Sequence, residues 1–169
     1  IETQLELQLD LPVVMGDESQ LSQVFINIVL NAIDAMPTGG TLRIRTEEYL
    51  IENSYADPMP LLGPRRRKGD PDESDYSHIR QINPLSVMLM KFSRGDRVVK
   101  VRISDTGVGI KKEDLERIFD PFFTTKDPDK GTGLGLSISL RIVESLGGEM
   151  RVESEVGKGS AFELYFPIA

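Results

Sequence analysis

The sequence predicts an α+β two-layer sandwich, in which a mixed β-sheet of about five strands carries three helices on one face. Segments in which apolar and polar residues alternate predict the strands, and apolar residues at helical spacing predict the helices. They follow one another as strand, helix, strand, insertion, strand, helix, helix, strand, strand. At 169 residues the chain has the length of one domain with a sizeable core, and we expect residues 1–169 to form a single domain.

The first half of the chain begins with a strand. Leucines alternate with polar residues from Leu5 to Leu11, which predicts a half-buried strand. Apolar residues then recur at helical spacing, and we expect a helix from about Glu18 to Met36, capped by Asp17 or Ser19. Alternation returns from Thr41 to Thr46 and predicts a second strand.

The second half supplies the remaining elements. A strongly β-branched run predicts a strand from Val98 to Ser104, and Lys111 to Ile118 reads as a short helix. A third helix is expected within Ser137 to Leu146, before two glycines. Two strands joined by a hairpin-type turn close the chain, at Glu149–Glu155 and Ala161–Ile168.

Between the two halves the composition changes. Residues 53–95 hold five prolines, a basic run from Arg65 to Lys68 and an acidic run from Asp70 to Asp75. The stretch is longer than a compact domain normally allows for a connection, so we expect an insertion that is partly disordered. Its one apolar piece, Leu85 to Phe92, either adds a strand or packs on the body of the domain.

The composition also limits the function. The net charge of −7 argues against a general nucleic-acid-binding protein. The absence of cysteine excludes disulfides and Cys-based metal sites and fits a cytosolic protein. No apolar run reaches the roughly 18–20 residues of a membrane span, so we expect no membrane contact by this domain. The start at Ile1 lacks an initiator methionine and a signal-peptide pattern, which indicates a piece of a longer protein.

A glycine-rich stretch lies just before the third predicted helix. Gly131, Gly133 and Gly135 fall within six residues, and glycine lets backbone N–H groups come close to a bound group. The N-terminus of a helix adds unpaired N–H donors and a partial positive charge. The stretch therefore predicts an anion site, most plausibly for phosphate, although glycine clusters of this kind also form ordinary turns.

Three further groups of residues are candidates for binding. Asn27 and Asn31 share one face of the first helix, either as surface amides or as oxygen ligands for Mg²⁺. Asp105 follows a strand, either as part of a turn or as a buried acceptor for an exocyclic amine, which would prefer adenine to guanine. Gly157, Gly159 and Ser160 form a third glycine element, which alone reads as an ordinary hairpin.

Together these motifs resemble those of a known family. In chain order they are Asn27-x-x-x-Asn31-Ala32, Asp105-Thr106-Gly107-Val108-Gly109, Phe119-Asp120-Pro121-Phe122-Phe123, Gly131-Thr132-Gly133-Leu134-Gly135-Leu136 and Gly157-x-Gly159-Ser160-x-Phe162. They look like the N box, the first glycine box, the F box and the second and third glycine boxes of the catalytic ATP-binding domain of bacterial sensor histidine kinases. These domains have the Bergerat fold, and their group, GHKL, also includes the DNA gyrase ATPase subunit, a heat-shock chaperone family and the MutL proteins.

The resemblance covers residues 17–36 and 98–168 well. The segment from Phe119 to Lys126, followed by the second glycine box, is similar to the nitrogen-regulation branch of these kinases.

The resemblance implies ATP and Mg²⁺ as cofactors. Asn31 would be the principal Mg²⁺ ligand, with Asn27 as a second catalytic residue that supports the metal or the phosphates. Asp105 would bind the adenine amine, with Ser160 beside it. The implied ATP-binding residues are Asn27, Asn31, Asp105, Gly107, Gly109, Ile110, Phe119, Thr125, Lys126, Lys130, Gly131, Thr132, Gly133, Leu134, Gly135, Leu136 and Ser160.

The chain departs from the family in the N box. Many sensor kinases carry Lys and an aromatic residue where this chain has Asp34 and Ala35. A phosphate-binding lysine is therefore missing from the first helix. Residues 123–130 correspond to the mobile lid over ATP, and its Lys126 and Lys130 are candidates to supply the missing charge, unless they are ordinary solvated lysines.

The single histidine, His78, is not expected to accept phosphate. Its surroundings, Ser77 to Leu85, resemble an acceptor motif, but the acid after the histidine is missing and the Asn-Pro pair falls one residue late. It also lies inside the ATP-binding domain, so we interpret the similarity as a coincidence.

The resemblance implies transfer of the ATP γ-phosphoryl to a histidine on a separate dimerisation domain of the same protein. The phosphoryl group would then pass to the receiver domain of a response regulator. The implied location is cytoplasmic, in a full-length protein with or without a membrane anchor. Two alternatives remain: an ATPase of the GHKL type, disfavoured by Asn27 where hydrolysing relatives have Glu, and a nucleotide-sensing module without turnover.

Overall fold

The computed structural model of the chain describes residues 1–51, 92–126 and 131–169. The predictions for the insertion 53–95, for its apolar piece and for His78 therefore fall almost entirely outside the described residues. Lys130 lies outside them as well.

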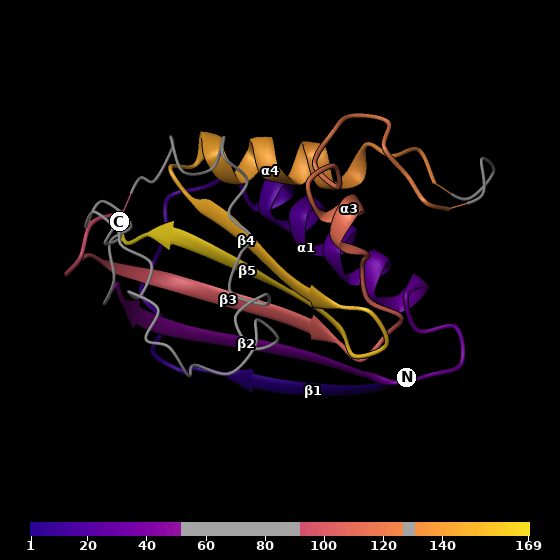
Figure 1. The fold of residues 1–169 in the computed structure, drawn as a ribbon. Helices are drawn as coiled ribbons and strands as arrows, with labels where there is room; N and C mark the ends of the chain where they lie inside the picture. Colours follow the sequence, from indigo (N-terminus) through magenta and orange to yellow (C-terminus); the bar gives the residue numbers. More distant parts are fainter. Residues whose placement is uncertain (52–91, 127–130) are drawn as a thin grey trace, which may run out of the picture.

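A mixed five-stranded sheet forms one layer of the molecule (Figure 1). Its strand order is β1-β2-β3-β5-β4, in which β1 and β2 run parallel and all other neighbours run antiparallel. The strands are β1 (Glu2–Leu7), β2 (Thr41–Leu50), β3 (Arg97–Asp105), β4 (Glu149–Glu155) and β5 (Gly159–Pro167).

Helices form the second layer, on one face of the sheet (Figure 1). Within the described residues they are α1 (Glu18–Asp34), α3 (Lys112–Leu115) and α4 (Gly135–Ser145). α1 packs against α4 and β3, and α4 packs against β4. The predicted two-layer fold is confirmed. No helix in the described parts of the chain is long and apolar enough to cross a bilayer.

The core lies between the two layers. α1 contributes Val24, Ile28 and Ala32, which recur every four residues and so point to one side of the helix. Alternate residues of β3 and β5 meet them, and Ile103 and Phe162 are paired directly across those strands. Burying one such large side chain stabilises the fold by roughly 1.5–3 kcal/mol, so this seam fixes how α1 lies over the sheet.

The ends of the helices differ slightly from the predictions. Asp17 caps α1, because its Oδ1 accepts the Gln20 N–H at 3.0 Å. The helix ends two residues early, at Asp34, before a turn that leads to Pro37. α3 is only one turn long, because the chain continues past Leu115 in turns whose N–H groups bond to the third preceding carbonyl, as from Arg117 to Asp114.

The prediction for the first strand was wrong in extent and burial. The strand spans Glu2–Leu7 rather than Leu5–Leu11, and Leu5 and Leu7 are 61% and 53% exposed. Both leucines point to the helix-bearing side, since Leu5 is in register with Ile44. However, β1 is the edge strand and the helices pack on β3 and β4, so the alternation correctly predicted a strand but not a covered one.

Candidate nucleotide-binding site

Most of the predicted site residues converge at one end of the sheet. There β3 ends at Asp105, β5 begins at Gly159, and the last turns of α1 face the start of α4. The loop between α3 and α4 returns to the same place, because Lys126 contacts Asn31. Residues from five elements and loops, far apart in the sequence, thus surround a single region.

Asp105 forms a rigid acceptor in this region. Its side chain is buried, and its Oδ1 accepts the N–H groups of Gly107 at 2.8 Å and Ser160 at 3.3 Å. Burial raises the pKa of Asp105, and these two N–H donors oppose that rise. Among the described residues, the hydrogen bonds of this carboxylate all go to Oδ1, which leaves Oδ2 with capacity to accept from a ligand.

The loop after Asp105 packs tightly on the end of α1. Val108 donates its N–H to the carbonyl oxygen of Ala35 at 2.9 Å. A Cβ on Gly107 would lie 2.5 Å from that same oxygen, so only glycine fits there. The packing of this loop on α1 therefore requires glycine at position 107. This requirement is separate from the predicted approach of its backbone to a base.

Ser154 is a site residue that the sequence reasoning missed. Its Oγ donates to the carbonyl of Gly159 at 3.0 Å and accepts the N–H of Ile110 at 2.8 Å. It lies 3.0 Å from the hydroxyl of Ser160, its partner across β4 and β5. Because the single proton of Ser154 is already donated, Ser160 is the donor in that pair, and its oxygen remains an acceptor. Nothing in the local sequence around Ser154 signals this role.

Asn27 is held by the first turn of α4. Its Nδ2 donates to the carbonyl of Gly135 and to Oγ of Ser139, both at 3.1 Å. Ser139 is fully buried, and its Oγ in turn donates to the Gly135 carbonyl at 2.9 Å. The amide oxygen of Asn27 is thus turned away from these two acceptors.

Asn31 already binds a cation. Its Oδ1 accepts the ammonium group of Lys126 at 2.9 Å, and the same ammonium lies 2.6 Å from Oδ2 of Asp34. Asp34 replaces the lysine that many sensor kinases carry at this position, and here it brings a lysine from another segment to the same place. Lys126 therefore lies beside the end of α1, and its role toward a phosphate stays a prediction.

The loop that leads to α4 has a strained start. Phe122 has φ 69°, a left-handed conformation that is uncommon outside glycine, and its side chain is 74% exposed. Its N–H bonds to the carbonyl of Gly133 at 2.9 Å, which ties the two ends of the loop together. Phe119 packs against the core, whereas Thr125 is exposed.

Among the described residues, nothing accepts the first N–H groups of α4. The N-cap residue, Leu134, makes no side-chain capping bond, and its own N–H bonds to the Thr132 hydroxyl at 3.4 Å. The first N–H groups of a helix have no partner within the helix, so those of Gly135 and Leu136 are suited to an anion. The helix start at which we predict an anion site lies beside Asn27.

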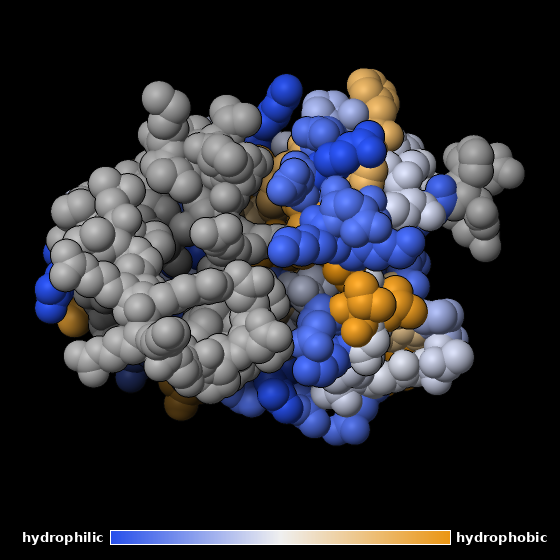
Figure 2. Space-filling model, viewed as in Figure 1, coloured by the Kyte–Doolittle hydropathy of each residue, from blue (hydrophilic) through white to orange (hydrophobic). Residues whose placement is uncertain are grey.

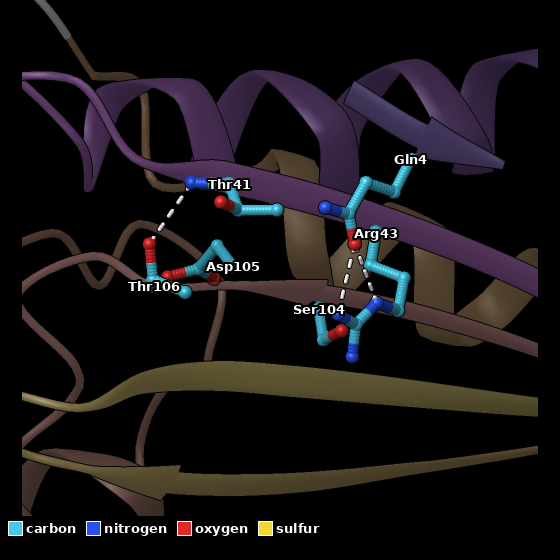
Figure 3. Close-up of a pocket in the computed structure, with 6 residues that line it drawn as sticks. All are labelled: Gln4, Thr41, Arg43, Ser104, Asp105 and Thr106. Carbon is cyan, nitrogen blue, oxygen red and sulfur yellow. Dashed lines mark hydrogen bonds between the residues drawn. The ribbon is translucent and has the colours of Figure 1, made fainter. Parts of the chain in front are cut away.

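A separate hollow lies on the opposite face of the sheet. It has a volume of about 150 Å³ and is lined by Gln4, Thr41, Arg43, Ser104, Asp105 and Thr106 (Figure 3). Arg43 is occupied there, donating from Nη2 to Gln4 Oε1 at 2.8 Å. Gln4, Arg43 and Ser104 are in register across β1, β2 and β3, on the face without helices. Only the end of β3 is shared with the site above.

Among the described residues, the candidate metal ligands at the site are amide oxygens rather than clustered carboxylates. In the described ranges, no group of three or more His, Cys, Asp or Glu side chains could hold a metal ion. The oxygens of Asn27 and Asn31 remain, and Asn31 Oδ1 holds an ammonium group that can stand in for a metal cation. This donor set fits Mg²⁺ only if phosphate oxygens or waters complete the coordination.

Comparison with known proteins shows the family of the chain. Residues 77–169 match the family model for "Histidine kinase-, DNA gyrase B-, and HSP90-like ATPase". The chain is 37% identical over 167 residues to sensor kinase CckA of Brucella abortus, covering 99% of this chain and 14% of the relative. It is 30% identical over 158 residues to sensor histidine kinase ZraS of Escherichia coli, covering 94% of this chain and 24% of the relative, in line with the nitrogen-regulation branch.

A solved structure supports the same relationship. The catalytic domain of the histidine kinase ThkA superposes with a TM-score of 0.63 at 27% identity, covering 99% of this chain and 78% of that one. The chain thus spans about four fifths of an isolated catalytic domain but only 14% and 24% of the two curated relatives. It belongs to the family of histidine kinase-, DNA gyrase B- and HSP90-like ATPases.

Proposed function

We propose that this chain is the catalytic domain of a sensor histidine kinase and transfers the γ-phosphoryl group of ATP to a histidine on a separate dimerisation domain. The observation that carries the proposal is the cation on Asn31, whose amide oxygen binds the Lys126 ammonium next to the start of α4. The amide oxygen of Asn31 would serve Mg²⁺, and the N–H groups at the start of α4 would serve the phosphates. The buried carboxylate of Asp105 would serve the adenine base.

Asp105 would recognise adenine. Two backbone N–H groups fix its Oδ1, so its Oδ2 can accept the exocyclic amine of the base. Guanine offers a carbonyl oxygen at that position, and two facing acceptors would leave a buried carboxylate unpaired. Gly107, Gly109, Ile110 and the oxygen of Ser160 would form the walls around the base.

The phosphates would lie at the start of α4. The N–H groups of Gly135 and Leu136 and the glycine-rich stretch from Gly131 would donate to them. The Lys126 ammonium group would leave Asn31 and bind a phosphate oxygen instead. Its ion pair with Asp34 would keep it near the site. Asn31, with Asn27, would hold Mg²⁺, which when bound neutralises charge on the phosphate oxygens.

Phosphoryl transfer then rests mainly on positioning. A neutral imidazole is already a nucleophile at pH 7, so the acceptor histidine needs no strong base from this domain. Asn27 cannot take a proton from water, since an amide is not a base at that pH, and its nitrogen is engaged by α4. This favours transfer to histidine over hydrolysis.

The remaining assignments follow from this activity. The partners would be the dimerisation domain of the same protein and the receiver domain of a response regulator. Use of ATP implies a cytoplasmic location. We also infer that residues 1–169 form one domain, because strands from both ends of the chain join one sheet.

The proposal is tested by supplying the chain with Mg²⁺–ATP and the dimerisation domain of its own full-length protein. We expect acid-labile phosphohistidine on the acceptor, reduced about tenfold or more in Asn31→Ala. Phosphate release without phosphohistidine would support the ATPase alternative. Nucleotide binding without either product would support a sensing module.

A further inference from the structure

Ser139 joins two parts of the site that the proposed function treats separately. It lies on the second turn of α4 with 0% of its surface exposed. Its Oγ donates to the carbonyl of Gly135 at 2.9 Å and accepts from Nδ2 of Asn27 at 3.1 Å. Nδ2 also donates to the Gly135 carbonyl, which closes a triangle of three hydrogen bonds, two of which join α1 to α4.

This triangle determines which way the Asn27 amide faces. The single proton of Ser139 goes to the Gly135 carbonyl, so its oxygen offers only lone pairs to Asn27. Both protons of Nδ2 then have an acceptor. If the amide were rotated by half a turn, its oxygen would face the Gly135 carbonyl oxygen, and only the Ser139 hydroxyl could still donate to it. Rotation therefore replaces three hydrogen bonds by one.

The fixed orientation leaves the amide oxygen free while the side chain stays beside the first residue of α4. A Cβ placed on Gly135 would lie 3.6–3.8 Å from Cγ, Oδ1 and Cβ of Asn27, so Oδ1 is near that residue without bonding to it. The free N–H groups of the same turn lie there too. A phosphate bound to those groups and a metal bound to that phosphate would both be within reach of Oδ1.

We propose that Ser139 is a positioning residue for Asn27, which keeps Oδ1 directed at the metal and the phosphates. The inference rests on the proposed function, since it assigns Asn27 to the Mg²⁺–ATP complex. α4 then acts twice: its first N–H groups bind the phosphates, and its second turn orients the side chain that supports the metal.

The test compares Ser139→Ala with a matched control on the same helix. Ser137 is also buried, and its Oγ donates to the Leu134 carbonyl at 2.9 Å, but it makes no bond to Asn27. ATP affinity is measured with Mg²⁺ and with a chelator in its place. We expect Ser139→Ala to weaken Mg²⁺-dependent ATP binding by about three- to tenfold, the range expected for one net hydrogen bond, and Ser137→Ala to leave it unchanged.

Three further measurements separate positioning from packing. Hydrogen exchange of the Asn27 side-chain amide in the nucleotide-free chain should speed up in Ser139→Ala. ATP affinity with the chelator should stay at the wild-type value. Ser139→Cys, which preserves the volume but accepts hydrogen bonds poorly, should show a similar loss if the alanine variant fails to fold.

A double-mutant comparison with Asn27→Ala completes the test. If Ser139 acts through Asn27, Ser139→Ala should add no further loss in that background. An equal loss with and without Asn27, or wild-type Mg²⁺ dependence in Ser139→Ala, would overturn the inference while Asn31→Ala still weakens binding. A wild-type chain that binds ATP without any Mg²⁺ dependence would overturn the proposed function and the inference together.

Discussion

Three polar side chains that we assign to the nucleotide, Asp105, Asn27 and Lys126, are each held by two partners before any ligand arrives. Asp105 accepts two backbone N–H groups, Asn27 donates to two oxygens, and Lys126 is shared by two side chains. Side chains fixed in this way lose little freedom when a ligand binds, which is the physical content of preorganisation.

At Asp105 this arrangement leads to a specificity prediction. In Asp105→Asn, the amide oxygen can still accept from Gly107 and Ser160, so the variant should fold. Its NH₂ group would then face the amine of adenine, donor against donor. We expect ATP affinity to fall by about ten- to a hundredfold, as measured by calorimetric titration.

GTP provides the comparison for this variant. Because Asn offers donors, the preference for ATP over GTP should shrink or reverse. An Asp105→Asn variant that keeps the wild-type affinity and preference would remove Asp105 from the base site.

A second residue-scale prediction concerns acid stability. Glu163 lies buried on the open face of the sheet, 2.9 Å from Lys100 and bonded to Arg102 and to the Tyr165 hydroxyl. Burial alone would raise the pKa of Glu163, but the hydrogen bonds from Tyr165 and Lys100, with Arg102, lower it to about 2. The unfolded chain binds this proton at about pH 4.3, so the stabilisation is complete above that pH and is lost as the pH falls toward 2.

The measurement is the free energy of unfolding between pH 2 and pH 7. Glu163→Gln should lower stability at pH 7 and flatten its decrease below pH 4.5. Glu153→Gln is the matched control, since Glu153 also pairs with Arg102, at 3.4 Å, but its side chain is 71% exposed. The control should change little. If the free energy of unfolding of Glu163→Gln decreased below pH 4.5 as steeply as that of the wild type, the lowered pKa of Glu163 would be contradicted.

At the scale of elements, the loop between α3 and α4 is held together by its backbone. Gly133 has φ 67°, and a Cβ there would lie 2.4 Å from the carbonyl carbon of Phe122. The glycine is thus required by the loop itself, before any phosphate is considered. This links the second glycine box to the F box through direct contact rather than through the ligand.

Gly133→Ala tests this link. The clash should separate the two ends of the loop and weaken ATP binding by about tenfold or more, while the core and most of the folding stability remain. Gly95→Ala is the control, because Gly95 also has a positive φ, 95°, but open space around its Cβ. It should lower the melting temperature alone. Equal ATP affinities in the two variants would show that the loop does not position the site.

Elements with strong periodicity were predictable, and contacts between distant elements were not. α1, β3 and the final hairpin follow from their apolar patterns, because α1 buries one face and β3 and β5 are central strands that are largely buried. The exposure of Leu5 depends on how far the helices reach across the sheet, which no local pattern encodes. The roles of Ser139 and Ser154 depend on partners more than 40 residues away in sequence, the Asn27 side chain for Ser139 and the Ile110 backbone N–H for Ser154. The glycine boxes could be found because their spacing is local.

For the molecule as a whole, the site that we propose occupies one end of the sheet. Seen from the side of Figure 1, the described surface is mostly hydrophilic, with apolar residues in small separate groups (Figure 2). The acidic chain, with a net charge of −7, would hold a polyanionic nucleotide through local donors and one lysine rather than through its overall field. The hollow on the open face is the alternative place for a nucleotide to bind.

The central claim is therefore tested most directly by mapping where Mg²⁺–ATP binds, using NMR chemical-shift changes in the labelled chain. We predict that the largest changes fall on the side-chain amides of Asn27 and Asn31 and on the backbone of Gly107 and Gly135. Changes concentrated instead on Gln4, Arg43 and Ser104, around the hollow in Figure 3, would contradict the account.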